Sequence, residues 1–223
     1  KAAESRITPQ NSRHQFYYDG GTRLYWRQDS NGVYIAVDEK SVSRALAVEL
    51  GLSRSSEGGP SEVDCAINRI QTRFNVAYAG ALAGYPAGLH TDGNRRLLIT
   101  EGPTLIEPKE GECPLISQLL GRMFQCGGID QRPYFYGWLK CAVECLQSGI
   151  RRPGQAIVLA GPPGSGKSLL QSLITQVLGG RSERPFTHLS GETSFNGELF
   201  SCVHQQVEDE ISTRDMRSRR RIG

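Results

Sequence analysis

Eight consecutive residues have the types and the spacing of a phosphate-binding loop. Residues 161–168 read Gly-Pro-Pro-Gly-Ser-Gly-Lys-Ser. Glycines let a backbone curl so that several N–H groups point into one concavity, which suits the phosphates of a nucleotide. In this pattern the lysine reaches the β- and γ-phosphates, and the hydroxyl after it takes a coordination position on Mg²⁺. We therefore predict a nucleotide site formed by Gly161, Pro162, Pro163, Gly164, Ser165, Gly166, Lys167 and Ser168.

Hydrolysis at such a loop requires carboxylates further along the chain. An acidic residue at a neighbouring strand end holds Mg²⁺, and a second carboxylate orients the attacking water. The suitable cluster is Val-Glu-Asp-Glu at 207–210. We predict Ser168 and Asp209 as metal ligands and Glu210 as the residue that activates water, so that Lys167, Asp209 and Glu210 form the catalytic set.

Two other interpretations of the acidic cluster stay open at this point. The metal and water positions can shift by one residue, to Glu208 and Asp209, and the cluster can also be a solvated acidic turn. Both arise because His204-Gln-Gln, just before the cluster, is more polar than a fully buried strand should be.

Two further segments are candidates for contacts with ligands. Gly191-Glu-Thr-Ser-Phe-Asn196 follows a predicted strand, where loops of α/β sheets carry function, but it also fits a turn whose asparagine caps the next helix. The arginines from Arg214 to Arg221 can contact nucleic-acid phosphates or a neighbouring subunit's nucleotide, and they equally fit a solvated helix face.

The elements around the loop are those of a parallel α/β sheet. A continuous apolar run at 155–160 predicts a buried strand that leads into the loop, and 168–178 predicts a helix that stops at two glycines. Residues 186–189 predict a second strand and residues 202–208 a third. Alternation of strand and helix favours a parallel sheet.

The upstream sequence has a different pattern. Residues 16–38 alternate apolar and polar side chains around Gly-containing turns, which predicts short strands, and helices are expected at 41–50 and from Pro60 onward. Glycines divide residues 76–108 into a small irregular β element. Helices are then predicted at 114–124 and at about 133–147, the second with an apolar face typical of core packing.

Composition describes an ordinary soluble protein. The 223 residues carry a net charge of +3, with 38% hydrophobic and 22% charged residues. No apolar run approaches the roughly 20 residues needed to span a bilayer, so we expect no membrane insertion and a cytoplasmic location. Six scattered cysteines lack zinc-ligand spacing and are interpreted as reduced thiols: Cys65, Cys113, Cys126, Cys141, Cys145 and Cys202.

Several features of the C-terminal segment together resemble a known set of motifs. They are the loop with its following leucines, Leu178-Gly-Gly, Phe195-Asn196, the acidic cluster with Ile211, and the arginines. The segment 155–223 resembles the helicase portion of phage and plasmid primase-helicases, the superfamily 3 type within the AAA+ class of P-loop NTPases. Residues 16–52 are similar in pattern, more loosely, to the small domain that precedes such helicases.

The resemblance implies ATP as the nucleotide and a ring, usually a hexamer, that translocates on single-stranded DNA during replication of a mobile element. Lys167 and Ser168 then match Walker A, and Asp209 and Glu210 match Walker B. It implies three regions: a small α+β, winged-helix-like region at 1–59, a helical/β linker and collar at 60–150, and a P-loop NTPase (helicase) domain at 151–223. If phage-encoded, the protein would act in the bacterial host cytoplasm.

One departure from this family concerns the sheet. In the AAA+ class a sensor strand lies between the P-loop strand and the Walker B strand, and it comes later in sequence than residue 223. The expected fold is therefore α/β with a partial P-loop NTPase sheet, incomplete at its C-terminus, after a smaller mixed α+β region. The alternatives are a P-loop kinase or small nucleotide switch, where the acidic strand lies beside the P-loop strand, and a nucleotide-binding regulatory module without motor activity.

Overall fold

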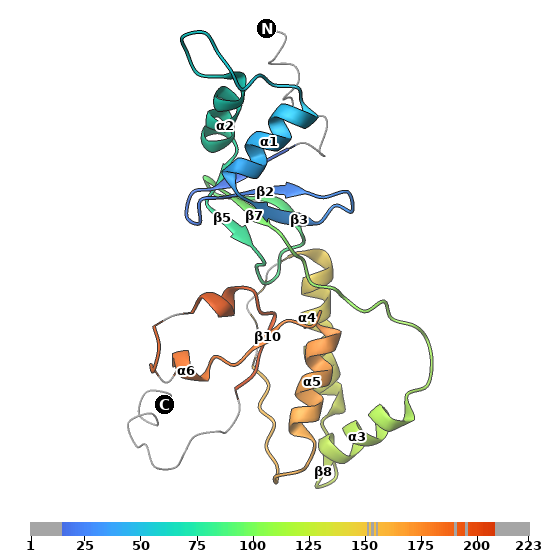
Figure 1. Ribbon diagram of the computed structural model, residues 1–223. Helices are drawn as coiled ribbons and strands as arrows, with labels where there is room; N and C mark the ends of the chain where they lie inside the picture. The colour runs from blue at the N-terminus through green and yellow to red at the C-terminus, as the bar shows by residue number, and fades with distance from the viewer. Residues whose placement is uncertain are drawn as a thin grey trace. The chain divides into compact units, whose positions relative to one another are not determined.

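The computed structural model describes residues 15–150, 152, 154, 156–189, 191–194 and 196–207. The described residues form two compact units, one within 1–81 and 87–101, the other within 82–86 and 102–223. Their elements are drawn in Figure 1. The two units do not coincide with the three predicted regions, whose boundaries stay a prediction.

The first unit is built on a four-stranded sheet in the order β3-β2-β1-β4. β1 (Tyr17–Asp19), β2 (Leu24–Gln28) and β3 (Tyr34–Val37) form an antiparallel meander, and β4 (Asn75–Val76) pairs with β1 in parallel. The predicted short strands and turns within residues 16–38 are therefore confirmed.

Two helices cover one face of this sheet, as Figure 1 shows. α1 (Glu39–Glu49) begins at Asp38, whose carboxylate accepts a hydrogen bond from the amide of Ser41 at 2.8 Å. α2 (Glu62–Arg73) begins with a capping box between Ser61 and Asp64. Such caps satisfy amides that have no partner within the helix. The sequence predicted both helices to within about two residues.

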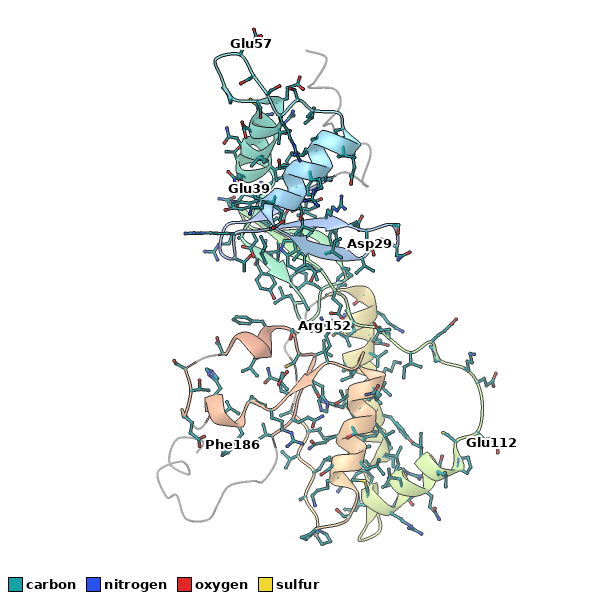
Figure 2. All side chains as sticks on the ribbon, in the orientation of Figure 1. Asp29, Glu39, Glu57, Glu112, Arg152 and Phe186 are labelled. Atoms are coloured by element: carbon teal, nitrogen blue, oxygen red, sulfur yellow. The ribbon has the colours of Figure 1, made fainter. Side chains whose placement is uncertain are left out.

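The two faces of the sheet bury alternating side chains. Tyr25 packs among the apolar residues of α1 and α2, and its hydroxyl donates to Glu39, labelled in Figure 2, at 2.9 Å. Burial is the largest cause that raises the Tyr25 pKa to about 12. On the opposite face, Tyr17 and Val76 pack with Leu98. Leu98 belongs to a second sheet, β5-β7-β6, formed by β5 (Tyr78–Gly80), β6 (Gly88–Asp92) and β7 (Arg95–Ile99).

The second unit holds three longer helices around one apolar core. They are α3 (Pro114–Phe124), α4 (Arg132–Ser148) and α5 (Lys167–Val177), with a small hairpin of β8 (Gln125–Cys126) and β9 (Ile129–Asp130) between the first two. Their shared core is formed by Leu120, Phe124, Phe135, Leu170, Ile174 and Leu178. All three helices were predicted, with shifts of one residue at α4 and α5.

The predicted strand at 186–189 is wrong. Phe186–Leu189 forms a short helix, α6, because Pro185 stands at its start and the Pro185 carbonyl accepts the amide of Leu189 at 2.9 Å. Proline has the backbone angle that the first turn of a helix needs. The strand lies just before it instead, as β10 (Ser182–Glu183), which pairs in parallel with β11 (His204–Gln205). β11 lies inside the third predicted strand.

The expected buried strand before the loop is extended but unpaired within the described residues, 156–160. Ile157 and Leu159 pack against the core of the second unit, whereas Val158 is 87% exposed. One face of the run is therefore covered by helices, and in the described part of the chain no strand lies beside it. The fold is mixed α/β with small sheets, and among the described residues none of these sheets is clearly the expected parallel P-loop sheet.

None of the helices in the described ranges is long and apolar enough to cross a membrane.

Candidate functional site

The glycine-rich loop lies between the extended run 156–160 and the first residue of α5. The amide of Ser165 donates to the carbonyl of Pro162 at 3.3 Å, which closes a turn at the tip of the loop. Gly164 and Gly166 have φ angles of 76° and 92°, a left-handed conformation that side chains disfavour. The two glycines thus give the loop its curled path.

Gly166 is required for a second reason. A Cβ atom at this position would lie 3.1 Å from Cδ1 of Leu119 on α3. Real Cβ contacts are rarely so short, so the absence of a side chain lets the loop pass close to α3. The curl of the loop is fixed against the helical core of the second unit.

The side chain of Lys167 turns back into the loop. Its ammonium donates to the carbonyl oxygens of Gly161 at 2.8 Å and Pro162 at 2.9 Å, and to Oγ of Ser165 at 3.3 Å. A lysine at the start of a helix usually extends into water, because its charge is strongly hydrated. Here three loop oxygens surround the ammonium, so the positive charge of Lys167 lies against the loop.

The N-terminus of α5 adds to this positive field. Gly166 is the N-cap, and in the described part of the chain no side chain caps the helix. The first amides of a helix have no partner within it, and the helix dipole places a partial positive charge there. Ser168 is exposed in this first turn. The loop, the lysine and the first turn of α5 together form a site suited to an anion with several oxygens.

The core of the second unit holds α5, and with it the loop, in place. Leu170, Ile174 and Leu178 lie on one face of the helix and are at most 3% exposed. They pack against α3 and α4. The predicted loop residues are therefore brought together as one local structure, anchored by the helix that follows.

The other predicted site residues are only partly described. Asp209, Glu210 and the segment from Arg214 to Arg221 lie outside the described residues, so their roles stay predictions. In the segment 191–196, Asn196 stands at the N-cap position of a short 3-10 helix, Gly197–Phe200, with no side-chain cap hydrogen bond among the described atoms. The described residues contain no group of three or more side chains able to hold a metal ion.

β11 brings the chain to the edge of the acidic cluster. The amides of Val203 and His204 donate to the carbonyl of Arg181, and the amide of Gln206 donates to that of Glu183 at 2.9 Å. These bonds tie the strand to β10. Val207, the last described residue, is 53% exposed.

Sequence reasoning missed one polar group in this region, Thr175 on α5. Its hydroxyl lies 2.8 Å from Nδ1 of His204 and 2.7 Å from Nε2 of Gln206. Burial lowers the pKa of His204, so the imidazole is neutral near pH 7. The sequence signal for this group was the polar His204-Gln-Gln within a predicted strand. In the sequence analysis it indicated only that the positions of the acidic residues could shift by one.

A hollow of about 460 Å³ lies beside these residues, but it is separate from the loop. It is lined by the C-terminal half of α5, by β10 and Arg184, and by Gln206. None of the predicted phosphate ligands lines it. Five of the six cysteines are free thiols, Cys65, Cys113, Cys141, Cys145 and Cys202, and burial raises the pKa of the Cys202 thiol.

Two solved structures share the fold of this chain, both of the apo form of the C-terminal region of NrS-1. They are 16% identical to it and match 84% of the chain, with TM-scores of 0.51 and 0.50. The chain spans about two-fifths of their length, 41% and 42%. The likeness is one of fold. Neither the family models nor the curated proteins contain a match to the chain.

Proposed function

We propose that residues 161–168 bind the triphosphate of ATP together with Mg²⁺, and that the whole protein couples ATP hydrolysis to translocation on single-stranded DNA as a replicative helicase. The observation that carries the proposal is the Lys167 ammonium, held by loop oxygens at the uncapped N-terminus of α5. A lysine so held keeps its positive charge beside the loop, where the phosphates would bind.

Each part of the loop has a role in holding the nucleotide. The loop amides and the first amides of α5 donate to phosphate oxygens, while Lys167 neutralises their charge. When the nucleotide binds, phosphate oxygens would replace the carbonyls of Gly161 and Pro162 as hydrogen-bond acceptors of the ammonium. The exposed hydroxyl of Ser168 and the carboxylate of Asp209 would hold Mg²⁺, which would supply positive charge beside the phosphate oxygens.

The acidic residues favour the hydrolytic class over the kinase alternative. The predicted glutamate directly after the metal-binding aspartate, Glu210 after Asp209, favours hydrolysis of the nucleotide. β11, which leads to the acidic cluster, pairs with β10. Because the run 156–160 has no strand partner among the described residues, strand pairing favours neither class.

The DNA and assembly parts of the proposal concern the whole protein. Their support is the resemblance of residues 155–223 to primase-helicases, the fold shared with the C-terminal region of NrS-1, and the arginines from Arg214 to Arg221. On this proposal the arginines contact DNA phosphates or a neighbouring subunit's nucleotide, and the protein assembles as a ring, usually of six subunits.

Nucleotide binding is tested by calorimetry with ATP and Mg²⁺ on this chain. Lys167→Ala removes a charged donor, and bonds to charged groups contribute about 1.5–3 kcal/mol, so its Kd should rise about 10- to 100-fold. Lys140→Ala on α4 is the matched control, because Lys140 is exposed and forms only an ion pair with Glu144 at 3.7 Å. Equal ATP affinity in the two variants would refute the binding proposal.

The motor part is tested on the whole protein by ATP turnover with and without single-stranded DNA. We expect the DNA to stimulate turnover and Lys167→Ala to abolish it. Turnover that does not respond to DNA would leave nucleotide binding intact but refute translocation. In that case the regulatory-module alternative would be favoured.

A further inference from the structure

A buried polar cluster joins the helix of the phosphate loop to the strand that leads to the acidic residues. It consists of Thr175 on α5, His204 on β11 and Gln206, the second residue after His204. The residues Thr175 and His204 are 6% and 9% exposed. Gln206 Nε2 lies 2.7 Å from Oγ1 of Thr175 and 3.5 Å from Nδ1 of His204.

The donors and acceptors of this cluster fit one protonation state of His204. The amide of Gln206 donates to Thr175, and its contact with Nδ1 of His204 is longer, at 3.5 Å. The Thr175 hydroxyl has one proton, which it donates to the carbonyl of Gln171 at 3.0 Å, so its oxygen accepts from the side chains around it. The consistent arrangement therefore has His204 neutral, with a proton on Nδ1 that it donates to Thr175. Burial, which disfavours the charged imidazole, acts in the same direction.

The pairing of β11 alone specifies its register weakly. β10 and β11 pair over two residues each, Ser182 with His204 and Glu183 with Gln205. Because side chains alternate along a strand, a slip of one residue would replace buried His204 by exposed Gln205. The slip would break the contacts of the Thr175 hydroxyl with His204 and Gln206 and leave it only its bond to the carbonyl of Gln171. A hydrogen bond of this kind contributes modestly to stability, so losing these contacts disfavours the slip.

We propose that Thr175, His204 and Gln206 form a register clamp, which fixes β11 against the helix of the phosphate loop and so sets the distance between the loop and the acidic residues. The three are positioning residues, because Thr175 lies about two helical turns beyond Lys167. The clamp rests on the proposed ATPase function. On this proposal the clamp holds the carboxylates after Val207 in position relative to the bound phosphates, and its three residues do not contact the nucleotide.

The chain supplies a matched pair of variants for the test. Thr175→Val removes the clamp hydroxyl while keeping the side-chain shape, and Thr175→Ser restores the hydroxyl. Thr72→Val on α2 is the control, since Thr72 bonds to the carbonyl four residues before it, as Thr175 does, but is exposed. The two valine variants therefore differ mainly in the bond to β11.

Turnover and ATP affinity are measured on the whole protein. For Thr175→Val we expect kcat to fall about ten-fold or more, because small displacements of catalytic groups have large effects on rate. The Kd for ATP should change by less than about two-fold, since the loop is intact. Thr175→Ser should recover most of the rate and Thr72→Val should match the wild type. Unchanged kcat in Thr175→Val, or parallel losses of kcat and affinity, would overturn the positioning role.

A second measurement separates the clamp from the ATPase proposal. Nitrogen-15 NMR of the histidine rings in this chain reports which ring nitrogen carries the proton, with His204→Gln for assignment. We expect His204 to be protonated on Nδ1 in the wild type and its Nδ1 signal to move in Thr175→Val. A proton on Nε2 instead, or a signal that Thr175→Val does not move, would overturn the clamp. Absence of turnover in the wild type would instead overturn the ATPase function and, with it, the positioning role.

Discussion

The loop can be perturbed at one glycine without changing any charge. Gly166→Ala adds a single methyl group at the N-cap of α5, where φ is 92°. Its matched control is Gly180→Ala, just after the same helix, where φ is 82° and an added Cβ would meet nothing within 4 Å. Both variants carry the same type of backbone strain, but only the first presses on α3.

The expected losses follow from these two geometries. A left-handed conformation costs an L-residue about 1–2 kcal/mol, so both variants should lose about this much free energy of unfolding. The Cβ at residue 166 also lies 3.1 Å from Cδ1 of Leu119, the end of a flexible side chain, so we add about 1 kcal/mol, the low end for overpacking. Gly166→Ala should therefore lower the free energy of unfolding by about 2–3 kcal/mol and Gly180→Ala by about 1–2 kcal/mol.

The second unit can be observed separately during denaturation. Trp138 packs against its core, whereas Trp26 packs in the first unit. In a Trp26→Phe background, fluorescence therefore follows the unfolding of the second unit in denaturant. ATP affinity, measured by calorimetry on the same proteins, should fall for Gly166→Ala and stay unchanged for Gly180→Ala. Equal stability of the two variants, with wild-type ATP affinity in both, would refute the account of Gly166.

Three other predictions concern the helices and the buried histidine. Ser61→Ala removes the N-cap acceptor of α2 and should destabilise the first unit by about 1 kcal/mol, read from Trp26 fluorescence in denaturant. Ile174→Ala opens the core under α5 and should destabilise the second unit by about 2–5 kcal/mol, while the same change at Val48, which is 78% exposed, should have almost no effect. Because the pKa of His204 is lowered on folding, its contribution to stability is complete above the unfolded pKa of about 6.5 and is lost below it, by at most about 1.4 kcal/mol per pH unit. Denaturation at several pH values should show that slope reduced in His204→Gln, and an identical slope in both proteins would contradict the assignment.

Local sequence signals predicted most helices well. Pro114 and Pro133 mark the first turns of α3 and α4, and Ser61 begins a capping box. These signals act within a few residues, so the sequence alone contains them. The same holds for the curled path of residues 161–168, since glycines at 164 and 166 permit the backbone angles that the loop adopts.

Strand assignments were less reliable. Residues 186–189, Phe-Thr-His-Leu, were predicted as a strand, but they form a short helix that begins after Pro185. The run at 156–160 has the composition of a central strand, yet whether it pairs depends on other segments being beside it. A strand is stabilised by partners distant in sequence, whereas a helix forms its hydrogen bonds within itself.

By itself, the sequence determined the phosphate-loop motif and the helix behind it, because both depend on residues within one short segment. The tertiary structure decided that β11 pairs with β10, and that His204 is buried against Thr175, 29 residues earlier in the chain. It also showed that the Lys167 ammonium turns back onto the loop carbonyls. Such contacts depend on how separate elements pack and which conformations their side chains adopt. No local sequence pattern specifies either.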